Sequence, residues 1–117
     1  QEIMELGRIL QKKTDNTIKS IADNASKKTY LFRGKKVCMV NVSHDLASDL
    51  GNYLVTKYDY DFAILWRYDH NTEEYYISMR SIDDKMDVSA LCKEFGGGGH
   101  KNAAGCSIKK HPIEVFN

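Results

Sequence analysis

The sequence predicts a compact α/β domain in which helices pack a mixed β-sheet and a helical connector precedes the sheet. Two observations support this expectation. Apolar residues recur every three or four positions in several segments, which is the period of a helix, whereas other segments alternate or are apolar throughout, as strands are. At 117 residues the chain fits one folded domain, which we place at residues 27–117, with the connector over residues 1–26.

The connector is predicted to be helical over residues 1–25. Its polar residues 14–17 can act as a break or a cap in the middle of the helix. The other face is polar and has little to bury against, so we interpret the segment as a link to a preceding domain. The first residue is Gln1 rather than Met, which suggests a processed chain or a piece of a longer one. The apolar stripe consists of Ile3, Leu6, Leu10, Ile18, Ile21, Ala22 and Ala25.

The first half of the domain is predicted to contain two strands, a helix and a central strand. Residues 28–33 and 36–42 read as two strands joined by a turn. Ser43 is expected to cap the next helix through its hydroxyl, and the apolar stripe of that helix ends at about Lys57. Residues 62–66 are apolar on both faces, which is typical of a strand in the middle of a sheet.

The second half is predicted to contain a turn, an alternating strand, a long last helix and a closing strand. Residues 69–72 have turn chemistry and residues 75–81 alternate strictly. Asp87 is expected to cap the last helix, and Gly96 lies where a left-handed residue ends such helices. The closing strand is expected to run through residues 106–108.

The composition excludes several classes of protein. With 17 basic and 16 acidic residues, the net charge of +1 excludes a domain that holds duplex DNA mainly by bulk charge. No stretch approaches 18 apolar residues and no secretory signal pattern is present, so no membrane association is expected. The three cysteines show no C-x-x-C spacing and are expected to be buried thiols of a cytoplasmic protein.

The most informative segment is the glycine run at residues 96–99, which His100 follows directly. Consecutive glycines are costly to order and favour neither helix nor strand. Their amides can turn toward one point and form an anion nest, while the ring of His100 can donate a hydrogen bond to a phosphate oxygen. A short helical turn over residues 100–104 would aim further amides at the same anion. A flexible hinge is the alternative explanation for the run.

A second group of residues supports an anion site. Ser78 and Arg80 share one face of the predicted strand, and Ser81 ends it. A guanidinium offers a planar fork for two phosphate oxygens, and hydroxyls can complete the shell around the phosphate. An arginine on the solvent face of a strand is the alternative.

Both groups lie within a stretch that resembles a known family. Ser78-Met79-Arg80-Ser81, Asp87-Val88-Ser89 and the glycine-rich His100 with Ala103-Ala104-Gly105 look like the DHH-associated carboxy-terminal domain of the DHH phosphoesterases. The resemblance covers residues 30–109 approximately. The family includes oligoribonucleases, phosphatases of adenosine 3′,5′-bisphosphate, cyclic-dinucleotide phosphodiesterases and RecJ-type exonucleases.

The resemblance implies the substrate-binding lobe of a manganese-dependent phosphoesterase that acts on short single-stranded oligonucleotides or phosphorylated nucleotides. An amino-terminal domain of the same polypeptide would carry the Asp-His-His motif and a pair of manganese ions. This chain would then hold no metal and hydrolyse nothing alone. Asn52 is a weaker candidate for a contact with base or ribose. By the same similarity, the residues around the phosphate would be Ser78, Arg80, Ser81, Gly97, Gly98, Gly99 and His100.

The chain also departs from the family pattern, because it contains no Asp-His-His. The nearest string, Asp-His-Asn at residues 69–71, falls in a predicted turn without further acidic ligands. Ser-His-Asp at residues 43–45 does not suit a catalytic triad, whose members are usually distant in sequence. His111 is expected to belong to the carboxy-terminal tail.

Two other functions remain open. The first is a non-catalytic nucleic-acid-binding module like the related domain that ends alanyl-tRNA synthetases, which would need an extended basic path or exposed stacking aromatics. The second is an interaction or dimerisation domain with a glycine hinge. Two basic segments bear on the first alternative: Lys27, Lys28, Arg33, Lys35 and Lys36, and then Lys101, Lys109 and Lys110.

Overall fold

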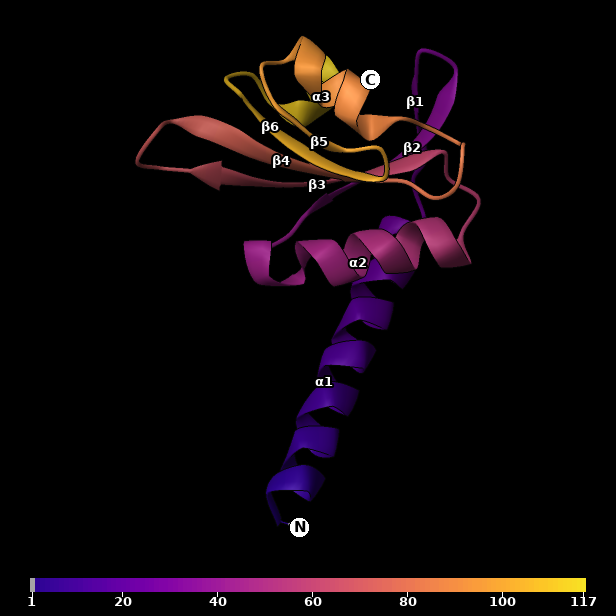
Figure 1. The fold of residues 1–117 in the computed structure, drawn as a ribbon, viewed down its shortest axis with the longest axis vertical. Helices are drawn as coiled ribbons and strands as arrows, with labels where there is room; N and C mark the ends of the chain where they lie inside the picture. The colour runs from indigo at the N-terminus through magenta and orange to yellow at the C-terminus, as the bar shows by residue number, and fades with distance from the viewer. Residues whose placement is uncertain (1) are drawn as a thin grey trace.

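The structure is a computed structural model that describes the backbone of residues 2–117 and the side chains of residues 12–117. Helices and strands follow one another in a mixed order, as predicted (Figure 1). The helices are α1 (Glu2–Ala25), α2 (His44–Lys57), α3 (Val88–Glu94) and α4 (Pro112–Val115). The strands are β1 (Tyr30–Phe32), β2 (Lys35–Asn41), β3 (Phe62–Asp69), β4 (Glu74–Arg80), β5 (Gly98–His100) and β6 (Ala103–Ile108).

All six strands form a single sheet in the order β1-β2-β3-β4-β6-β5. β2 and β3 are parallel because α2 carries the chain back across the sheet between them, and the other neighbours are antiparallel. The sheet is therefore mixed, and the strand predicted from residues 62–66 lies in its middle.

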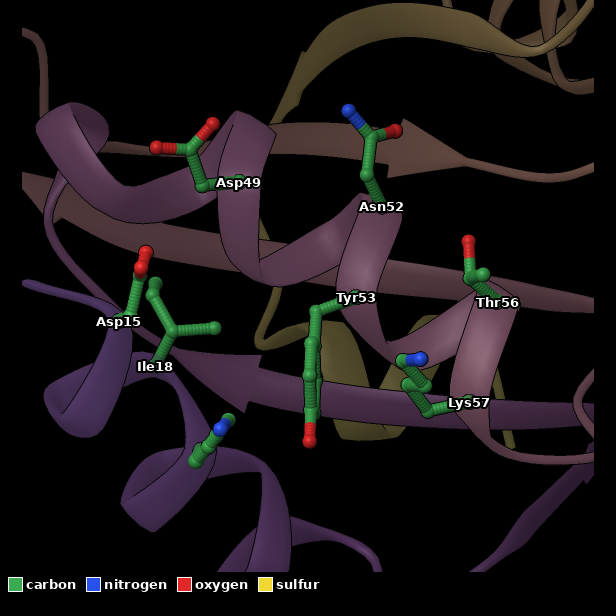
Figure 2. Close-up of a pocket in the computed structure, with 8 residues that line it drawn as sticks. Asp15, Ile18, Asp49, Asn52, Tyr53, Thr56 and Lys57 are labelled. Carbon is green, nitrogen blue, oxygen red and sulfur yellow. The ribbon is translucent and has the colours of Figure 1, made fainter. Parts of the chain in front are cut away.

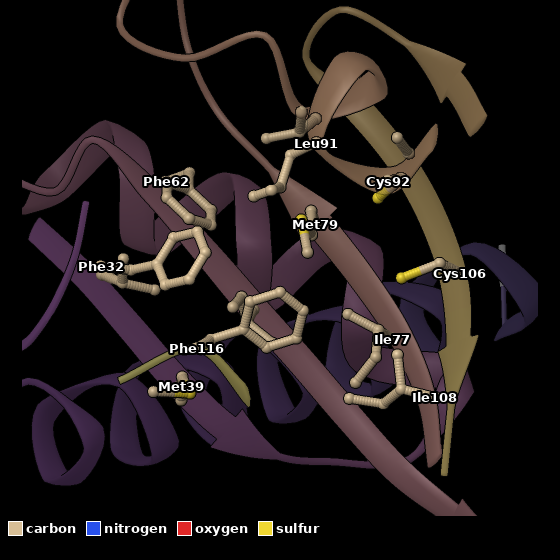
Figure 3. Packing of buried hydrophobic residues seen from close by; sticks show 14 residues of the cluster. Phe32, Met39, Phe62, Ile77, Met79, Leu91, Cys92, Cys106, Ile108 and Phe116 are labelled. Atoms are coloured by element: carbon tan, nitrogen blue, oxygen red, sulfur yellow. The ribbon is translucent and has the colours of Figure 1, made fainter. Parts of the chain in front are cut away.

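Helices cover the sheet from both sides and create two buried layers. α2 and the last turns of α1 pack on one face, where Leu50, Leu54 and Ala22 meet the side chains of β2 and β3. Figure 1 shows α2 below the sheet and α3 above it. On the α3 face, Figure 3 shows Leu91 and Phe116 packed over the strands. β2 and β3 therefore present alternate residues to two different interiors.

α1 is continuous, so the break considered for residues 14–17 does not occur. The hydroxyl of Thr17 donates to the carbonyl of Lys13 at 2.9 Å, which keeps this polar stretch within the helix. Ile18 and Ala22 are buried against the domain, while the amino-terminal turns project away from it (Figure 1). Neither α1 nor any other helix in the described part of the chain is long and apolar enough to cross a membrane.

The two predicted helix caps have different outcomes. Asp87 caps α3 as predicted, because its carboxylate accepts from the amides of Ser89 and Ala90 at 3.1 Å each. Ser43 does occupy the cap position of α2, but its hydroxyl makes no capping hydrogen bond. Gly96 has the expected positive φ of 84° after the end of α3.

The carboxy-terminal end differs from the prediction. α3 is short and is not the last helix, because α4 follows the closing strand. His111 is not a free tail residue: its Nδ1 accepts from the amide of Ile113 at 3.1 Å and caps α4. The same ring packs against Trp66 with centroids 4.7 Å apart. The cap and the ring contact fix the chain end over the sheet.

The second half of the glycine run, Gly98 and Gly99, begins the edge strand β5, and the helical turn considered for residues 100–104 is absent. β5 pairs with β6 through a turn at residues 101–102. A Cβ on Gly97 would lie 2.1 Å from the carbonyl oxygen of Gly105, and Gly99 has a φ of 147°. Glycine is thus required because β5 lies unusually close to β6, which is a steric reason that the sequence did not reveal.

Candidate functional site

Part of the α2 side of the sheet has no helix over it. α2 packs on β3 and the adjacent part of β4, and the side chains of β4, β6 and β5 beyond it are not fully buried. The alternating residues on the opposite side, such as Ile77, Met79 and Cys106, are buried. We call this area the open sheet face; its residues are Tyr76, Ser78, Arg80, Gly98, His100, Ala103, Gly105 and Ser107.

Strand register places Arg80 and His100 in one row across this face. Ala103 pairs with Arg80 on one side and with His100 on the other. Directly paired residues point to the same face, and two strand spacings separate the outer backbones by about 10 Å. Ala103, the residue between them in this row, contributes only a methyl group. The arrangement suits a small anion held between two donors.

Arg80 is a half-buried cation without an acidic partner. Its Nη1 donates to the carbonyl oxygen of Met79 at 2.9 Å, and none of the ion pairs among the described side chains includes it. Burial lowers the pKa of the Arg80 guanidinium from its usual value, although the group stays protonated. A partly desolvated guanidinium with free donors is well suited to bind a phosphate.

Gly51 on α2 lets Arg80 adopt this position. A Cβ at residue 51 would lie 2.6 Å from Cγ of Arg80 and 2.9 Å from Cδ2 of Leu65. The helix therefore passes directly over the arginine side chain. Sequence reasoning missed Gly51, although a glycine in the apolar stripe of a helix is a signal of close approach.

The two predicted serines have different environments. Ser78 lies beside Arg80 on the open sheet face and is half-buried. Ser81 is only 5% exposed; its hydroxyl donates to the carbonyl of Met86 at 2.7 Å and accepts from Nδ2 of Asn102 at 2.8 Å. Ser81 thus ties the segment after β4 to the β5–β6 turn. A direct phosphate contact from Ser81 stays a prediction.

The predicted glycines also divide by position. Gly98 belongs to the open sheet face and pairs with Gly105, which pairs in turn with Ser78. Gly97 and Gly99 instead lie so close to β6 that a Cβ atom at either position would collide with it. Gly98, Gly105 and Ala103 thus make a floor of backbone and small side chains in and beside the row of Arg80 and His100.

Asn52 lies at a different hollow. It is exposed on α2 and helps to line a groove of about 410 Å³ between α1 and α2, together with Ile18 and Tyr53 (Figure 2). In Figure 2 its amide points away from Ile18 and α1. Its predicted contact with a nucleotide remains a prediction.

The described residues offer no cluster of three or more His, Cys, Asp or Glu side chains that would hold a metal ion. The Asp-His-Asn string forms the β3–β4 turn, where the carboxylate of Asp69 accepts from the amide of Asn71 at 2.9 Å. His44 is exposed in the first turn of α2, as expected for a surface residue.

The two basic segments do not form a continuous path. One contains β1 and the start of β2 at one edge of the sheet, and the other adjoins β5 and β6 at the opposite edge. Several of these cations are also paired with carboxylates. The pairs are Arg33 with Glu94, Lys36 with Asp59, and Lys101 with Asp84.

Comparison with known proteins identifies the family to which this chain is similar. The DHHA1 domain profile matches residues 34–117. An uncharacterized protein of Acanthamoeba polyphaga mimivirus is 43% identical over 67 residues, which cover 56% of this chain and 16% of that protein. The oligoribonuclease NrnB of Bacillus subtilis is 48% identical over 40 residues, covering 34% of this chain and 10% of the enzyme. The chain thus matches a small part of each of these longer relatives.

Solved structures share the fold at low sequence identity. The pGpG-specific phosphodiesterase PggH of Vibrio cholerae superposes with a TM-score of 0.59 at 11% identity, covering 89% of this chain and 36% of that one. The C-Ala domain of Aquifex aeolicus alanyl-tRNA synthetase superposes with a TM-score of 0.58 at 16% identity, covering 75% of this chain and 91% of that one. From the sequence match and the shared architecture, the chain belongs to the DHHA1 domain family, the DHH-associated domain of the DHH phosphoesterases.

Proposed function

We propose that this domain is the substrate-binding lobe of a manganese-dependent DHH-family phosphoesterase acting on short oligonucleotides or phosphorylated nucleotides. Arg80 and His100 hold a terminal phosphate over the floor of small residues, and Ser78 and the amide of Gly98 lie beside it. The DHHA1 family match and the partial similarity to an oligoribonuclease support this assignment.

The observation that carries the proposal is the unpaired Arg80 in one row with His100. A half-buried guanidinium ordinarily has a carboxylate partner, because desolvating a charge without compensation is costly. Here a substrate phosphate takes the place of that partner. The proposed contribution of the domain is to orient the phosphate and to neutralise its charge.

Metal chemistry enters this proposal through a further domain of the same polypeptide. Manganese ions bound there would supply an activated water and stabilise the oxygens of the displacement. The residues of this chain bind and orient the substrate. The isolated chain is accordingly expected to bind dinucleotides in the presence of manganese without turning them over.

A nucleic-acid-binding module is the second candidate, since the C-Ala domain of an alanyl-tRNA synthetase has the same fold over most of its length. A groove for a long strand needs cations along its whole path. The basic segments of this chain lie at opposite edges of the sheet and are partly paired. This charge distribution favours a local phosphate pocket over an extended groove.

Binding of adenosine 3′,5′-bisphosphate to the ¹⁵N-labelled chain tests the proposal. We expect the amides of residues 97–100 to shift on titration, and adenosine without phosphate to cause no such shift. Arg80→Ala and His100→Ala should each weaken binding about 10- to 100-fold, because a charge-assisted hydrogen bond contributes about 1.5–3 kcal/mol. Lys110→Ala serves as a control, since this exposed lysine lies outside the open sheet face.

Two results would contradict the proposal. Unchanged affinity of both variants for the bisphosphate would remove the row of Arg80 and His100 from the site. Affinity that rises steadily with the length of a single strand would instead favour the groove of a nucleic-acid-binding module.

A further inference from the structure

Tyr76 is an exposed aromatic residue on the open sheet face. Its side chain is 45% exposed, whereas its neighbours in β4, Tyr75 and Ile77, pack on the other side of the sheet. Tyr68, the other exposed tyrosine of this hairpin, packs its ring against Tyr75 and His70. No ring contact with another aromatic residue is found for Tyr76 among the described side chains. Packing within a buried cluster of aromatic rings therefore does not explain why a tyrosine lies at residue 76.

One side of the Tyr76 ring is covered by a cation. The guanidinium of Arg67 lies 4.8 Å from the ring centroid. Arg67 is directly opposite Tyr76 on β3. The stack fixes the orientation of the ring and adds a positive charge at this end of the open sheet face.

The other side of Tyr76 adjoins a hollow at the start of β5. This hollow has a volume of about 380 Å³ and is lined by Tyr76, Phe95, Gly97, Gly105 and Ser107 among others. Its volume lies within the range of roughly 300 to 1,000 Å³ that is usual for small-ligand sites. β3 and β6 flank β4, so Arg67 and the hollow lie on opposite sides of the tyrosine. A flat ring can enter the hollow and stack on Tyr76.

We propose that Tyr76 and this hollow form a base-stacking subsite for a second nucleotide of a short single-stranded oligonucleotide. The inference rests on the proposed function, because it takes the phosphate to lie at Arg80 and His100. Tyr76 is four residues from Arg80 along one strand, which is about 13 Å. From this separation we take the stacked base to belong to a neighbouring nucleotide rather than to the one whose phosphate is held at Arg80.

The chemistry of the hollow indicates how selective the subsite is. Its wall is glycine backbone and the side chains of Tyr76, Phe95, Cys106 and Ser107, so the side-chain hydroxyls that could contact the edge of a base are those of Tyr76 and Ser107. Every base has a π-face, so stacking of this kind tolerates sequence. The strands contribute Arg67, Arg80 and His100 to this side of the sheet, and the carboxylates of Asp69 and Glu74 lie beyond Tyr76, at the turn end of the β3–β4 hairpin. A polyanionic chain can thus follow β4 from Arg80 to Tyr76.

Two probes of different length test the subsite. Adenosine 3′,5′-bisphosphate carries one base, and the 5′-phosphorylated diadenylate pApA carries two. Tyr76→Ala and Tyr76→Leu should weaken pApA binding by about 5- to 150-fold, the range expected for loss of one stacked base. Affinity for the bisphosphate should change less than twofold. Tyr76→Phe keeps the ring and should bind both probes like the wild type.

Tyr68→Ala is the matched control, because Tyr68 is a partly exposed tyrosine of the same hairpin on the opposite face. It should leave pApA binding unchanged, and amide spectra verify that each variant is folded. Unchanged pApA affinity in Tyr76→Ala would overturn the subsite while leaving the phosphate site intact. An equal loss with both probes would overturn the assignment to a second nucleotide. Failure of the wild type to bind either probe would instead refute the proposed function.

Discussion

Gly51→Ala tests whether the close packing of α2 on Arg80 holds the arginine in place. The new methyl carbon would lie 2.6 Å from Cγ of Arg80 and 2.9 Å from Cδ2 of Leu65. Both distances are shorter than real carbon contacts, so one of the two side chains has to move. Arg80 has the freer side chain, and we expect it to leave its place on the open sheet face.

Two opposing terms set the change in stability. Overpacking a well-filled site costs about 1–3 kcal/mol. Replacing glycine by alanine within a helix returns about 1 kcal/mol. The free energy of unfolding should therefore fall by only about 0–2 kcal/mol. Phosphate affinity should fall more, by about 10- to 100-fold, because the charged hydrogen bonds of Arg80 are lost.

A double-mutant cycle with Arg80→Ala separates the two effects. In that background the Cγ atom is gone, so Gly51→Ala should destabilise the protein less, by about 1 kcal/mol or more. Urea unfolding gives the four free energies, and titration with adenosine 3′,5′-bisphosphate gives the affinities. Equal destabilisation in both backgrounds, together with unchanged affinity of Gly51→Ala, would refute the reasoning.

Two further predictions concern the scaffold behind the site. Phe116→Ala removes a fully buried ring whose centroid lies 5.5 Å from that of Phe32 and 5.2 Å from that of Phe95. Urea unfolding should show that the free energy of unfolding falls by about 3–5 kcal/mol. A fall of less than about 1 kcal/mol would contradict this packing. Hydrogen bonds from the Ser89 side chain and from the amide of Ala90 lower the pKa of Asp87 below its usual 3.8. Its contribution to stability is therefore present above pH 3.8 and lost as the pH falls through the folded pKa. The stability difference between the wild type and Asp87→Asn should shrink on acidification, and a constant difference would argue against this cap.

Local sequence patterns predicted the geometry of β4 and the cap of α3 well. The alternation of residues 75–81 placed Ser78 and Arg80 on one face because side chains of any strand alternate, whatever packs around it. Asp87 was recognisable as a cap because its hydrogen bonds reach only two and three residues ahead. Features that depend on neighbouring residues alone were therefore accessible from the sequence.

Features that depend on distant parts of the chain were not accessible in this way. Gly98 and Gly99 lie in a strand because β5 pairs with β6, although glycine has a low intrinsic preference for strands. A Cβ on Gly99 would collide with Ala104 of β6. His111 is fixed by a ring contact with Trp66, which is far away in sequence. Ser43 makes no side-chain cap although its residue type favours one. For the glycine run and His111 the tertiary environment decided the outcome, whereas nothing in the structure explains the missing Ser43 cap.

The two edges of the sheet have a consequence for how the domain meets other molecules. Both edge strands, β1 and β5, are only three residues long. Short edge strands are poor templates for pairing with another chain, which is the usual route to sheet-mediated aggregation. The domain can therefore leave a broad face of its sheet open to a ligand without offering a long strand edge to a second copy of itself.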